Sequence, residues 1–505
     1  MASQIKPKEQ KALQQAQSFL SQNDAESAKN LLVTYTRKNK ASHNTRYLLS
    51  LSHAILGEFK EALIPANLLV KEQAKNIEYL KLLGGIFHGL LQYEQAIAIF
   101  NRALKINPQD IQTLSNIASS LKESQHYDEA ETYFKQSLTL HANQPDALTN
   151  YGLLLQDNAK LDEAIELHNK ALQLAPEHNV AMYNLAYALN EKGKHESSLQ
   201  AYQRVLKITP YHVRALCDIA HVYGKLMQAE NAMPYLQRAL EVSPEDEHVH
   251  LNVGISHKML GQFKQAENSF EKVIQINQHN NTAKYYLAIM RGDSTMVSSP
   301  DEYVQELFNG YAETFDDQLI GQLHYKTPEL IGSMVTKHSD LNKKHKILDL
   351  GCGTGLAGIY LKDISEHMIG IDLSSKMLKK AEDRNIYNEL VTSAIDQYFE
   401  NHDFQPDIVV SADVFVYIGD IASIFENTSK SISDDGIFVF STEDTQDADQ
   451  FILKDSGRFA HNEKYIRSLA NSYNFEFIDH EKTIIRYEAD TPIHGQVYLL
   501  KKVIK

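Results

Sequence analysis

The sequence predicts an α-helical solenoid followed by an α/β domain with a mostly parallel sheet. Three observations carry this prediction. Small residues recur every 34 positions through the first 280 residues, short β-rich runs alternate with helical stretches after residue 303, and a glycine-rich loop follows the first of those runs. A chain of 505 residues has the length of about three domains, so one compact core is not expected.

The first part of the chain carries its small residues in two registers. One register places a small residue in each period, and the second lies twelve residues ahead of it, from Ala16 to Gly254. Two small sites in each unit allow two antiparallel helices to approach closely, and prolines such as Pro108 and Pro176 end the second helix. Each unit is therefore predicted to be a helical hairpin. The first register comprises Ala28, Ala62, Ala96, Ala130, Ala164, Ser198, Ala232 and Ala266.

This pattern resembles the tetratricopeptide repeat, whose 34-residue unit has small residues at these offsets and a late proline. The period is kept eight times from residue 9 to residue 280 without an insertion, although no tryptophan fills the usual aromatic position. We expect residues 1–291 to form a solenoid of eight repeats, in which the segment 281–291 is a capping helix. The default use of such a solenoid is to bind an extended partner on its concave face.

Four asparagines share one position of the first helix in their units. Carboxamides stacked along a groove can hydrogen-bond the backbone of a bound polypeptide, as similar asparagine ladders do in related superhelices. The alternative is that each asparagine bonds only within the repeats. We therefore predict a protein or peptide client in the repeat groove, with the ladder as its contact. The four residues are Asn116, Asn150, Asn184 and Asn252, with Asp218 in the vacant place between the last two.

The second part of the chain alternates β-rich runs with helical stretches. KILDL, HMIGIDL, ELVTSA, DIVVSADV and GIFVFSTE are separated by helical sequence, whereas FEFIDHEKTIIRYE and QVYLLKKVI have no helix between them. This alternation implies right-handed crossovers and a mostly parallel sheet with helices on both faces, with the last two runs forming an antiparallel hairpin at one edge. We interpret residues 292–303 as a linker and residues 304–505 as the second domain.

A glycine-rich loop, LDLGCGTGLAG, follows the first β-rich run. Gly351, Gly353 and Gly355 permit a tight turn and a close approach of the backbone to a ligand, next to the start of a helix. The spacing differs from the GxGxxG fingerprint for NAD. Asp372 ends the second run, where a carboxylate can accept both hydroxyls of a ribose, and Asp396 follows the third, where it can meet an adenine amine. These residues predict a nucleotide-like ligand.

Together these features resemble class I S-adenosylmethionine-dependent methyltransferases, which have a Rossmann-like fold, over residues 301–505. A closer likeness, through LFNGYAETFDDQL, SADVFVYIGD and GRFAHNEKYI, is to bacterial methyltransferases fused to tetratricopeptide repeats. The resemblance implies S-adenosylmethionine as the cofactor. Asp349 and the glycines would hold its methionine moiety, Asp372 its ribose and Met377 its adenine. The implied donor-binding residues are Asp349, Gly351, Cys352, Gly353, Gly355, Asp372, Leu373, Met377, Asp396 and Tyr311.

Tyr311 belongs to a predicted helix ahead of the sheet. The helix either packs on the core through one face, with Phe308 and Phe315, or covers the donor as a lid that brings Tyr311 close to the transferring methyl. Both interpretations fit the spacing of the aromatic residues.

Candidate catalytic residues lie where strands are expected to end. The sulfonium donor needs an in-line nucleophile and no metal, and no metal site is expected. Asp413 and Tyr417 follow the fourth strand and Glu443 the fifth, the edge at which open α/β sheets bind ligands. Each of the three either contacts substrate or only caps a helix or stabilises a loop. Arg458 and His461 open what is expected to be the next helix. There Arg458 would orient an acceptor carboxylate and His461 would act as a general base, unless both only shape the helix entry.

Three functions remain open on this basis. The leading interpretation is a methyltransferase acting on a protein or peptide recruited by the repeats. The second is a small-molecule methyltransferase whose repeats serve assembly or localisation. The third is a scaffold that binds the donor without turnover.

Charge and hydropathy exclude other classes of partner. Residues 1–300 carry 30 basic and 30 acidic residues, so the net charge of −15 lies in the last 205 residues, which disfavours a nucleic-acid substrate. No segment approaches the ~20 apolar residues of a membrane span. With no secretory signal and only two cysteines, we expect a cytoplasmic protein without a membrane partner.

Overall fold

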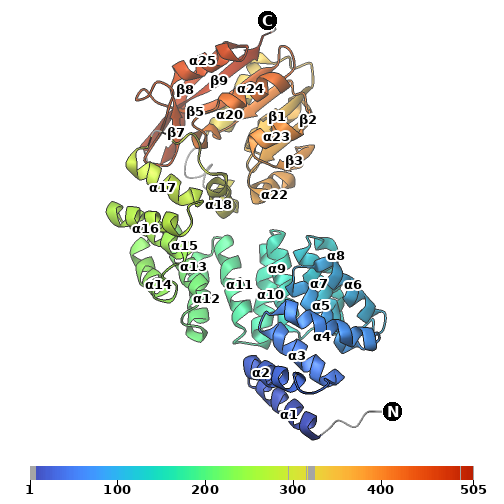
Figure 1. Ribbon diagram of the computed structural model, residues 1–505. Helices are drawn as coiled ribbons and strands as arrows, with labels where there is room; N and C mark the ends of the chain where they lie inside the picture. The colour runs from blue at the N-terminus through green and yellow to red at the C-terminus, as the bar shows by residue number, and fades with distance from the viewer. Residues whose placement is uncertain (1–6, 294, 314, 317–324, 489–490, 504–505) are drawn as a thin grey trace. The chain divides into compact units, whose positions relative to one another are not determined.

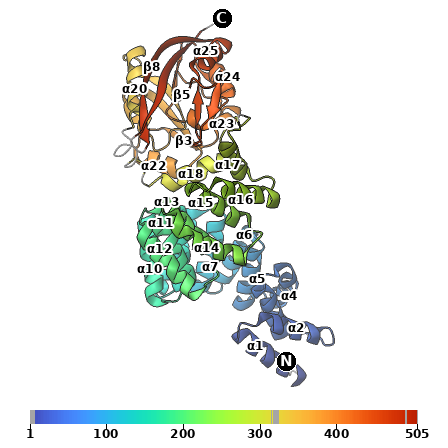
Figure 2. The same cartoon turned by 90° about the vertical axis from the view of Figure 1, so that its left-hand side faces the viewer.

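The computed structural model describes residues 7–293, 295–313, 315–316, 325–488 and 491–503 (Figure 1; Figure 2). The chain divides into two compact units, Met1–Ala188 and Leu189–Lys505. The first unit contains repeat helices, and the second contains the remaining repeat helices together with the α/β domain. Within the described ranges, no helix has the length and apolar character needed to cross a bilayer.

Antiparallel helix pairs follow the predicted 34-residue period, and the helical-repeat part of the predicted fold class is confirmed. The helices are α1 (Pro7–Ser21), α2 (Ala25–Thr36), α3 (His43–Ile55), α4 (Phe59–Glu72), α5 (Ile77–Gly89), α6 (Tyr93–Leu104), α7 (Ile111–Glu123), α8 (Tyr127–Leu140), α9 (Pro145–Asp157), α10 (Leu161–Leu174), α11 (Asn179–Glu191), α12 (His195–Ile208), α13 (Val213–Lys225), α14 (Ala229–Val242), α15 (Glu247–Met259), α16 (Phe263–Ile276) and α17 (Asn281–Arg291).

The small residue of the first helix in a hairpin lies beneath a ring from the second helix. A Cβ added at Gly84 would lie 2.4 Å from the ring of Phe100, and one at Gly254 would lie 2.5 Å from the ring of Phe270. Both rings are almost completely buried. At Gly84 and Gly254 the second register therefore needs glycine, because a ring occupies the space that a Cβ would need.

Helix α17 spans the segment predicted as a capping helix. One face packs Ala283 and Leu287 against Phe270 of the last repeat. The other face does not meet solvent, because it shares a buried cluster with the α/β domain. That cluster contains Tyr285, Ala288, Ile289, Leu453 and Phe459.

The α/β domain is built on a sheet whose first five strands are parallel, with the order β3-β2-β1-β4-β5. The long β8–β9 hairpin is antiparallel, as predicted, and β9 pairs with β5. The strands are β1 (His345–Leu350), β2 (Ser365–Asp372), β3 (Glu389–Thr392), β4 (Ile408–Ser411), β5 (Ile437–Asp444), β6 (Phe451–Leu453), β7 (Phe459–His461), β8 (Phe475–Glu488) and β9 (Thr491–Lys502).

Helices cover both faces of this sheet (Figure 1). Ile331 and Val335 of α20 pack on one face, and Phe425 and Ile466, from α24 and α25, pack on the other. The predicted α/β class is thereby confirmed. The helices of the domain are α18 (Asp301–Tyr311), α20 (Thr327–His338), α21 (Leu356–Leu361), α22 (Ser375–Asp383), α23 (Ile395–Asn401), α24 (Ala422–Ser431) and α25 (Glu463–Ser472), with short 3₁₀ turns η1 (Lys362–Ile364) and η2 (Phe415–Tyr417).

Two local features differ from the sequence-based expectation. The segment after β5 forms a short antiparallel hairpin, β6–β7, where a helix start was predicted, and α25 begins only at Glu463. In the segment interpreted as a linker, Ser298 bridges Ile418, and the Val297 carbonyl accepts the backbone N–H of Gly419 at 2.8 Å. That part of the segment is hydrogen-bonded to the α/β domain.

The ring contacts of the repeats yield a stability test on adjacent glycines. Gly84→Ala should lower the free energy of unfolding by about 1–3 kcal/mol, because its Cβ overlaps the buried ring of Phe100. Gly85→Ala is the matched control, since nothing lies within 4 Å of its Cβ. Helix propensity predicts that it stabilises by roughly 0.5–1 kcal/mol. Urea unfolding of both full-length variants, followed by circular dichroism, measures the effects, and equal shifts of the same sign would contradict this packing.

Candidate functional site

A cavity of about 940 Å³ lies at the carboxyl ends of the central parallel strands. Its walls are the glycine loop after β1, the turn after β2, the segment after β4, helix α18, and the turn between β6 and β7. Most residues predicted from the sequence meet here, although they come from distant segments of the chain. Those that line the cavity are Tyr311, Gly351, Gly353, Asp372, Leu373, Met377, Asp396, Asp413, Tyr417 and Arg458.

The glycine loop presents its backbone to the cavity. Gly351 and Gly353 have φ values of +68° and +56°, in the left-handed region that glycine tolerates best. The nearest atoms to a Cβ added at Gly353 are 4.0 Å away, so the loop surface is open there. Gly355 differs, because it caps α21 at φ +85° and its Cβ would meet the Tyr387 ring at 2.9 Å. Gly355 does not line the cavity, and its lack of a Cβ leaves space for the Tyr387 ring at the start of α21.

Asp349 lies behind this loop and is completely buried. Its Oδ2 accepts a hydrogen bond from the Tyr387 hydroxyl at 2.7 Å, whereas its Oδ1 has no partner among the described residues. Burial raises the pKa of Asp349 to about 7, although the Tyr387 hydrogen bond opposes this shift. Asp349 and Cys352 line a recess of about 40 Å³ that shares Gly353 with the larger cavity. Cys352 is buried, and burial raises the pKa of its thiol.

Asp372 ends β2 at the edge of the same loop. Its Oδ2 accepts the backbone N–H of Gly353 at 2.9 Å, and its Oδ1 accepts that of Ser374 at 2.8 Å. Burial nevertheless raises the pKa of Asp372 to about 6. The negative charge of Asp372 also contributes to the raised pKa of Asp349. A buried carboxyl group at Asp349 and a half-buried one at Asp372, both with raised pKa values, favour a cationic ligand.

Helix α18 contacts the turn after β2 directly. Gln305 Nε2 donates to the Leu373 carbonyl at 3.0 Å, and Ser374 Oγ donates to Asn309 Oδ1 at 2.7 Å. None of the helix residues from Asp301 to Tyr311 is buried, and Tyr311 is 42% exposed while it lines the cavity. This arrangement favours the covering role of the helix over the packed-core alternative.

Met377 and Asp396 border the part of the cavity next to Asp372. The Met377 side chain is 1% exposed and belongs to the first turn of α22. Asp396 stands in the first turn of α23, where it accepts hydrogen bonds from Ser423 Oγ at 3.1 Å and Asn427 Nδ2 at 3.2 Å.

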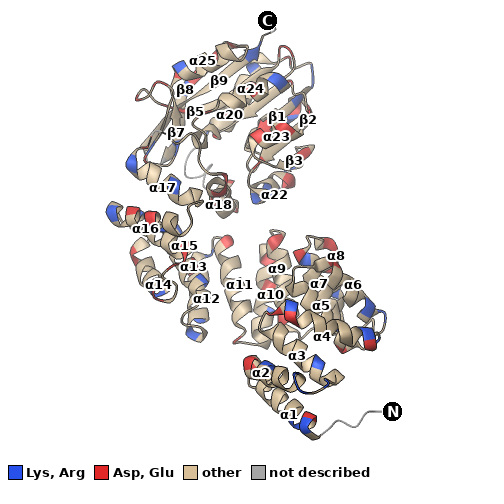
Figure 3. Ribbon diagram, in the orientation of Figure 1, with Lys and Arg blue, Asp and Glu red and all other residues tan. Residues whose placement is uncertain are grey.

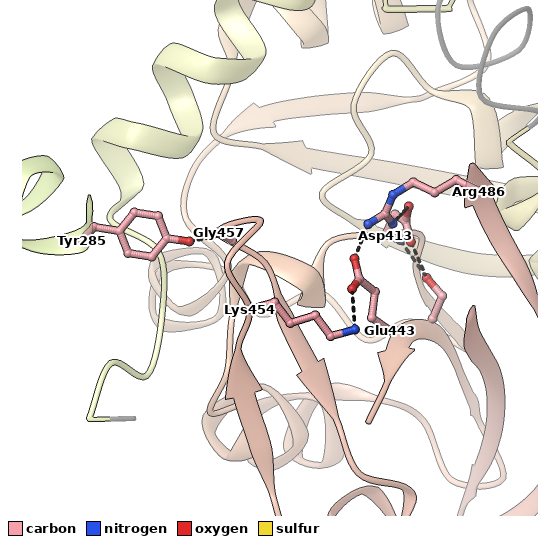
Figure 4. A network of polar contacts seen from close by, with 7 residues as sticks. Tyr285, Asp413, Glu443, Lys454, Gly457 and Arg486 are labelled. Carbon is pink, nitrogen blue, oxygen red and sulfur yellow. Dashed lines mark hydrogen bonds and ion pairs between the residues drawn. The ribbon is translucent and has the colours of Figure 1, made fainter. Parts of the chain in front are cut away.

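A charged network stands at another wall of the cavity (Figure 4). Arg486 Nη1 donates to Asp413 Oδ2 at 3.0 Å, and Arg486 also pairs with Glu443. Glu443 Oε2 in turn pairs with Lys454 Nζ at 3.1 Å. Asp413 has φ +58°, and its N–H donates to Ser441 Oγ at 2.8 Å, which turns its carboxylate toward Arg486.

The network corrects one sequence-based expectation and adds one residue that the sequence did not predict. Glu443 was predicted to touch substrate, but its side chain is 3% exposed and lies behind Arg486. Arg486 lines the cavity and was not predicted. Its only signal was a charged residue within the β-rich run FEFIDHEKTIIRYE, which by itself indicates nothing about a site.

His461 does not occupy the position expected of a general base. Its side chain is completely buried at the end of β7, between Phe451 and Tyr465. Nε2 donates to the Gly419 carbonyl at 2.9 Å, and burial lowers the pKa of the ring to about 4. The error arose because the segment was expected to open a helix at the pocket, whereas it forms a strand whose ring faces the core.

The repeat asparagines differ in their surroundings. Asn116 is exposed, and the Asn150 amide donates to Ser119 Oγ at 3.4 Å. Asn184 is buried, with an Nδ2 that has no partner in the described part of the chain. Asn252 donates to the His248 carbonyl of its own helix at 2.8 Å, which is the alternative role proposed for this position.

Comparisons with known proteins agree with this architecture. A methyltransferase-domain family model matches residues 341–488, and tetratricopeptide-repeat models match 13–77, 78–110, 111–143, 143–210, 213–246 and 248–280. A malonyl-[acyl-carrier protein] O-methyltransferase of Bacillus anthracis is 26% identical over 28% of this chain and 52% of its own. A ubiquinone biosynthesis O-methyltransferase of Hydrogenovibrio crunogenus is 29% identical over 27% of this chain and 58% of its own.

Among solved structures, magnesium protoporphyrin IX methyltransferase from Synechocystis, with bound S-adenosylhomocysteine, is 15% identical. It covers 40% of this chain and 99% of its own, with a TM-score of 0.33. The chain matches little more than half the length of the two relatives above.

The residues at the glycine loop fit S-adenosylmethionine. The unpartnered buried Oδ1 of Asp349 can accept a hydrogen bond from an ammonium group, and the open backbone at Gly353 leaves space beside it. The donor carries positive charge on its sulfonium and ammonium groups, and the carboxylates of Asp349 and Asp372 attract such charge. The family matches and the site together show that residues 13–280 are a run of tetratricopeptide repeats. The chain continues into a methyltransferase domain of the S-adenosylmethionine-dependent class.

Proposed function

We propose that this chain transfers a methyl group from S-adenosylmethionine to a protein or peptide that the repeats recruit. The observation that carries the proposal is a single cavity whose lining includes Gly353, Asp372 and Met377 together with Tyr417 and Arg458. We assign the first three residues to the donor part of the cavity and the last two to the acceptor part. A cavity of this kind brings an acceptor and a donor together in one desolvated space.

When bound, S-adenosylmethionine supplies a methyl group already activated on a positively charged sulfur. Asp349 and the Gly351–Gly353 backbone would hold its amino-acid end, Asp372 its ribose hydroxyls, and Met377 with Asp396 its adenine. Each Asp372 oxygen already accepts one backbone N–H and keeps a second lone pair for a hydroxyl. Helix α18, tied to Leu373 and Ser374, excludes water from this part.

The acceptor part depends on orientation. Holding an acceptor in line with the methyl group can supply roughly 7–11 kcal/mol of barrier reduction. Asp413 and Tyr417 line the cavity and are the remaining candidates for taking a proton, since His461 is buried. Arg486 fixes the direction of the Asp413 carboxylate through its 3.0 Å contact.

Recruitment by the repeats is the second part of the proposal. The matched repeats extend from residue 13 to residue 280, which gives a hairpin array far longer than a small acceptor needs. The experiment is transfer of labelled methyl groups from S-adenosylmethionine into cell lysate, which is then separated by size. Label in macromolecules supports the proposal. Label confined to small solutes supports the small-molecule alternative, and absence of label supports a donor-binding scaffold.

Asp372→Ala should weaken donor binding roughly 10- to 150-fold, because it removes charge-assisted hydrogen bonds worth about 1.5–3 kcal/mol each. Asp383→Ala, at an exposed aspartate at the end of α22, is the matched control and should bind as the wild type does. Titration calorimetry with S-adenosylmethionine measures both. Wild-type affinity in a folded Asp372→Ala variant would refute the assignment of the ribose site.

Joint replacement of Asn116, Asn150 and Asn184 by alanine should lower the kcat/KM for a macromolecular client about tenfold or more. Hydrogen bonds to the client backbone are lost, while donor affinity is kept.

The control for this change replaces three exposed asparagines outside the register, Asn107, Asn143 and Asn169, by alanine. Steady-state transfer to the labelled client compares the two triple variants. Equal kcat/KM values in both would assign the ladder a structural role only.

A further inference from the structure

We propose that Tyr285, in the helix α17 that closes the repeats, is a positioning residue for the acceptor part of the cavity. The inference rests on the proposed methyl transfer and adds to it a residue outside the methyltransferase domain. Tyr285 fixes the turn between β6 and β7, which forms one wall of the cavity. The residues of this wall are Ser456, Gly457 and Arg458.

The turn is closed by its own backbone and pressed against α17. The Lys454 N–H donates to the Arg458 carbonyl, and the Gly457 N–H donates to the Lys454 carbonyl, both at 2.8 Å. Gly457 has φ +78°, and a Cβ there would lie 3.2 Å from Ile289 Cδ1 of α17. Only glycine combines this backbone conformation with this approach to the helix.

The Tyr285 hydroxyl is the polar link between α17 and the wall (Figure 4). It donates to the Gly457 carbonyl and accepts from Ser299 Oγ at 2.8 Å, because its single proton is used by the carbonyl. Gly457 and Ser299 both line the cavity. Burial raises the pKa of Tyr285 to about 12, so the hydroxyl stays a donor at neutral pH.

The same turn has a second anchor in the sheet. Lys454, its first residue, pairs with Glu443, which pairs with Arg486, which holds Asp413. The turn is therefore held on one side by a network that reaches the cavity at Asp413 and on the other by Tyr285. Because Arg458 belongs to this turn and lines the cavity, its position depends on both anchors. The donor residues Asp349 and Asp372 contact neither anchor in the described hydrogen bonds.

The test uses full-length Tyr285→Phe, which removes the hydroxyl and keeps the ring packed on Leu453 and Phe459. Tyr235→Phe is the control, because the Tyr235 ring lies beside the Tyr223 ring within the repeats and Tyr235 does not line the cavity. We expect the half-saturating concentration of the methyl-accepting lysate fraction to rise about tenfold in Tyr285→Phe, the effect of one buried hydrogen bond. kcat and the donor Kd should stay within about twofold of the wild type, as should every parameter of Tyr235→Phe.

Hydrogen exchange supplies a readout that needs no acceptor. Amides of residues 454–458 should exchange faster in Tyr285→Phe than in the wild type or the control. An unchanged half-saturating concentration would overturn the positioning role, and so would a matching loss of donor affinity. If the wild type transfers no label, the proposed function fails and the role of Tyr285 toward the acceptor fails with it. The exchange result then decides only whether Tyr285 fixes the turn: faster exchange confined to residues 454–458 shows that it does, and unchanged exchange shows that it does not.

Discussion

The partial removal from water of two carboxyl groups beside the glycine loop, Asp349 fully and Asp372 in part, is the constraint on which the site depends. Asp349 lies in β1 and Asp372 ends β2, and the parallel pairing of these strands brings both to one edge of the sheet. Neither has a cationic partner among the described ion pairs. Burial therefore raises both pKa values, to about 7 and about 6. Because neither carboxyl group has a cationic partner in the described part of the chain, a bound cation would stabilise their charged forms and thereby the folded protein.

The rest of the domain is arranged around this edge. Positive φ values at Gly351 and Gly353 turn the backbone so that the Gly353 N–H reaches Asp372 and the cavity stays open. Helix α18 covers the turn after β2 through two hydrogen bonds from its polar face. Across the cavity, the Arg486 network fills the space between β4, β5 and β8 with paired charges. One wall of the cavity thus contains the Asp372 carboxyl group, and another contains the ion pair of Arg486 with Asp413.

Much of this arrangement followed from local sequence. The 34-residue period predicted the hairpins because small residues in the first helix leave space for a side chain sixteen positions later, as Gly84, Gly152 and Gly254 do for the rings of Phe100, His168 and Phe270. The glycine loop and Asp372 were predictable because their chemistry depends on neighbours in the sequence and on the end of a parallel strand. Asp413 and Tyr417 were placed at the cavity for the same reason.

The errors share a different cause. Arg486 becomes a site residue only because β8 folds back along β9, so that a residue 73 positions away from Asp413 reaches it. Glu443 was expected to face substrate, but the same arginine covers it. His461 belongs to a three-residue strand, too short for any alternation of polar and apolar residues to reveal which way its ring points. Tyr285 was not singled out from the sequence, because its partner, Gly457, is 172 residues away.

The central claim is that a cationic donor binds beside the carboxyl groups of Asp349 and Asp372. Proton release on donor binding tests this claim most directly. Calorimetric titrations at pH 6.5, in buffers with different ionisation enthalpies, count the protons exchanged. With pKa values of about 7 and about 6 in the free protein, the pair holds roughly one proton at pH 6.5. A bound cation lowers both pKa values, so binding should release roughly one proton at this pH. A binding enthalpy that does not vary with the buffer would show that no proton leaves, and it would contradict this account of the site.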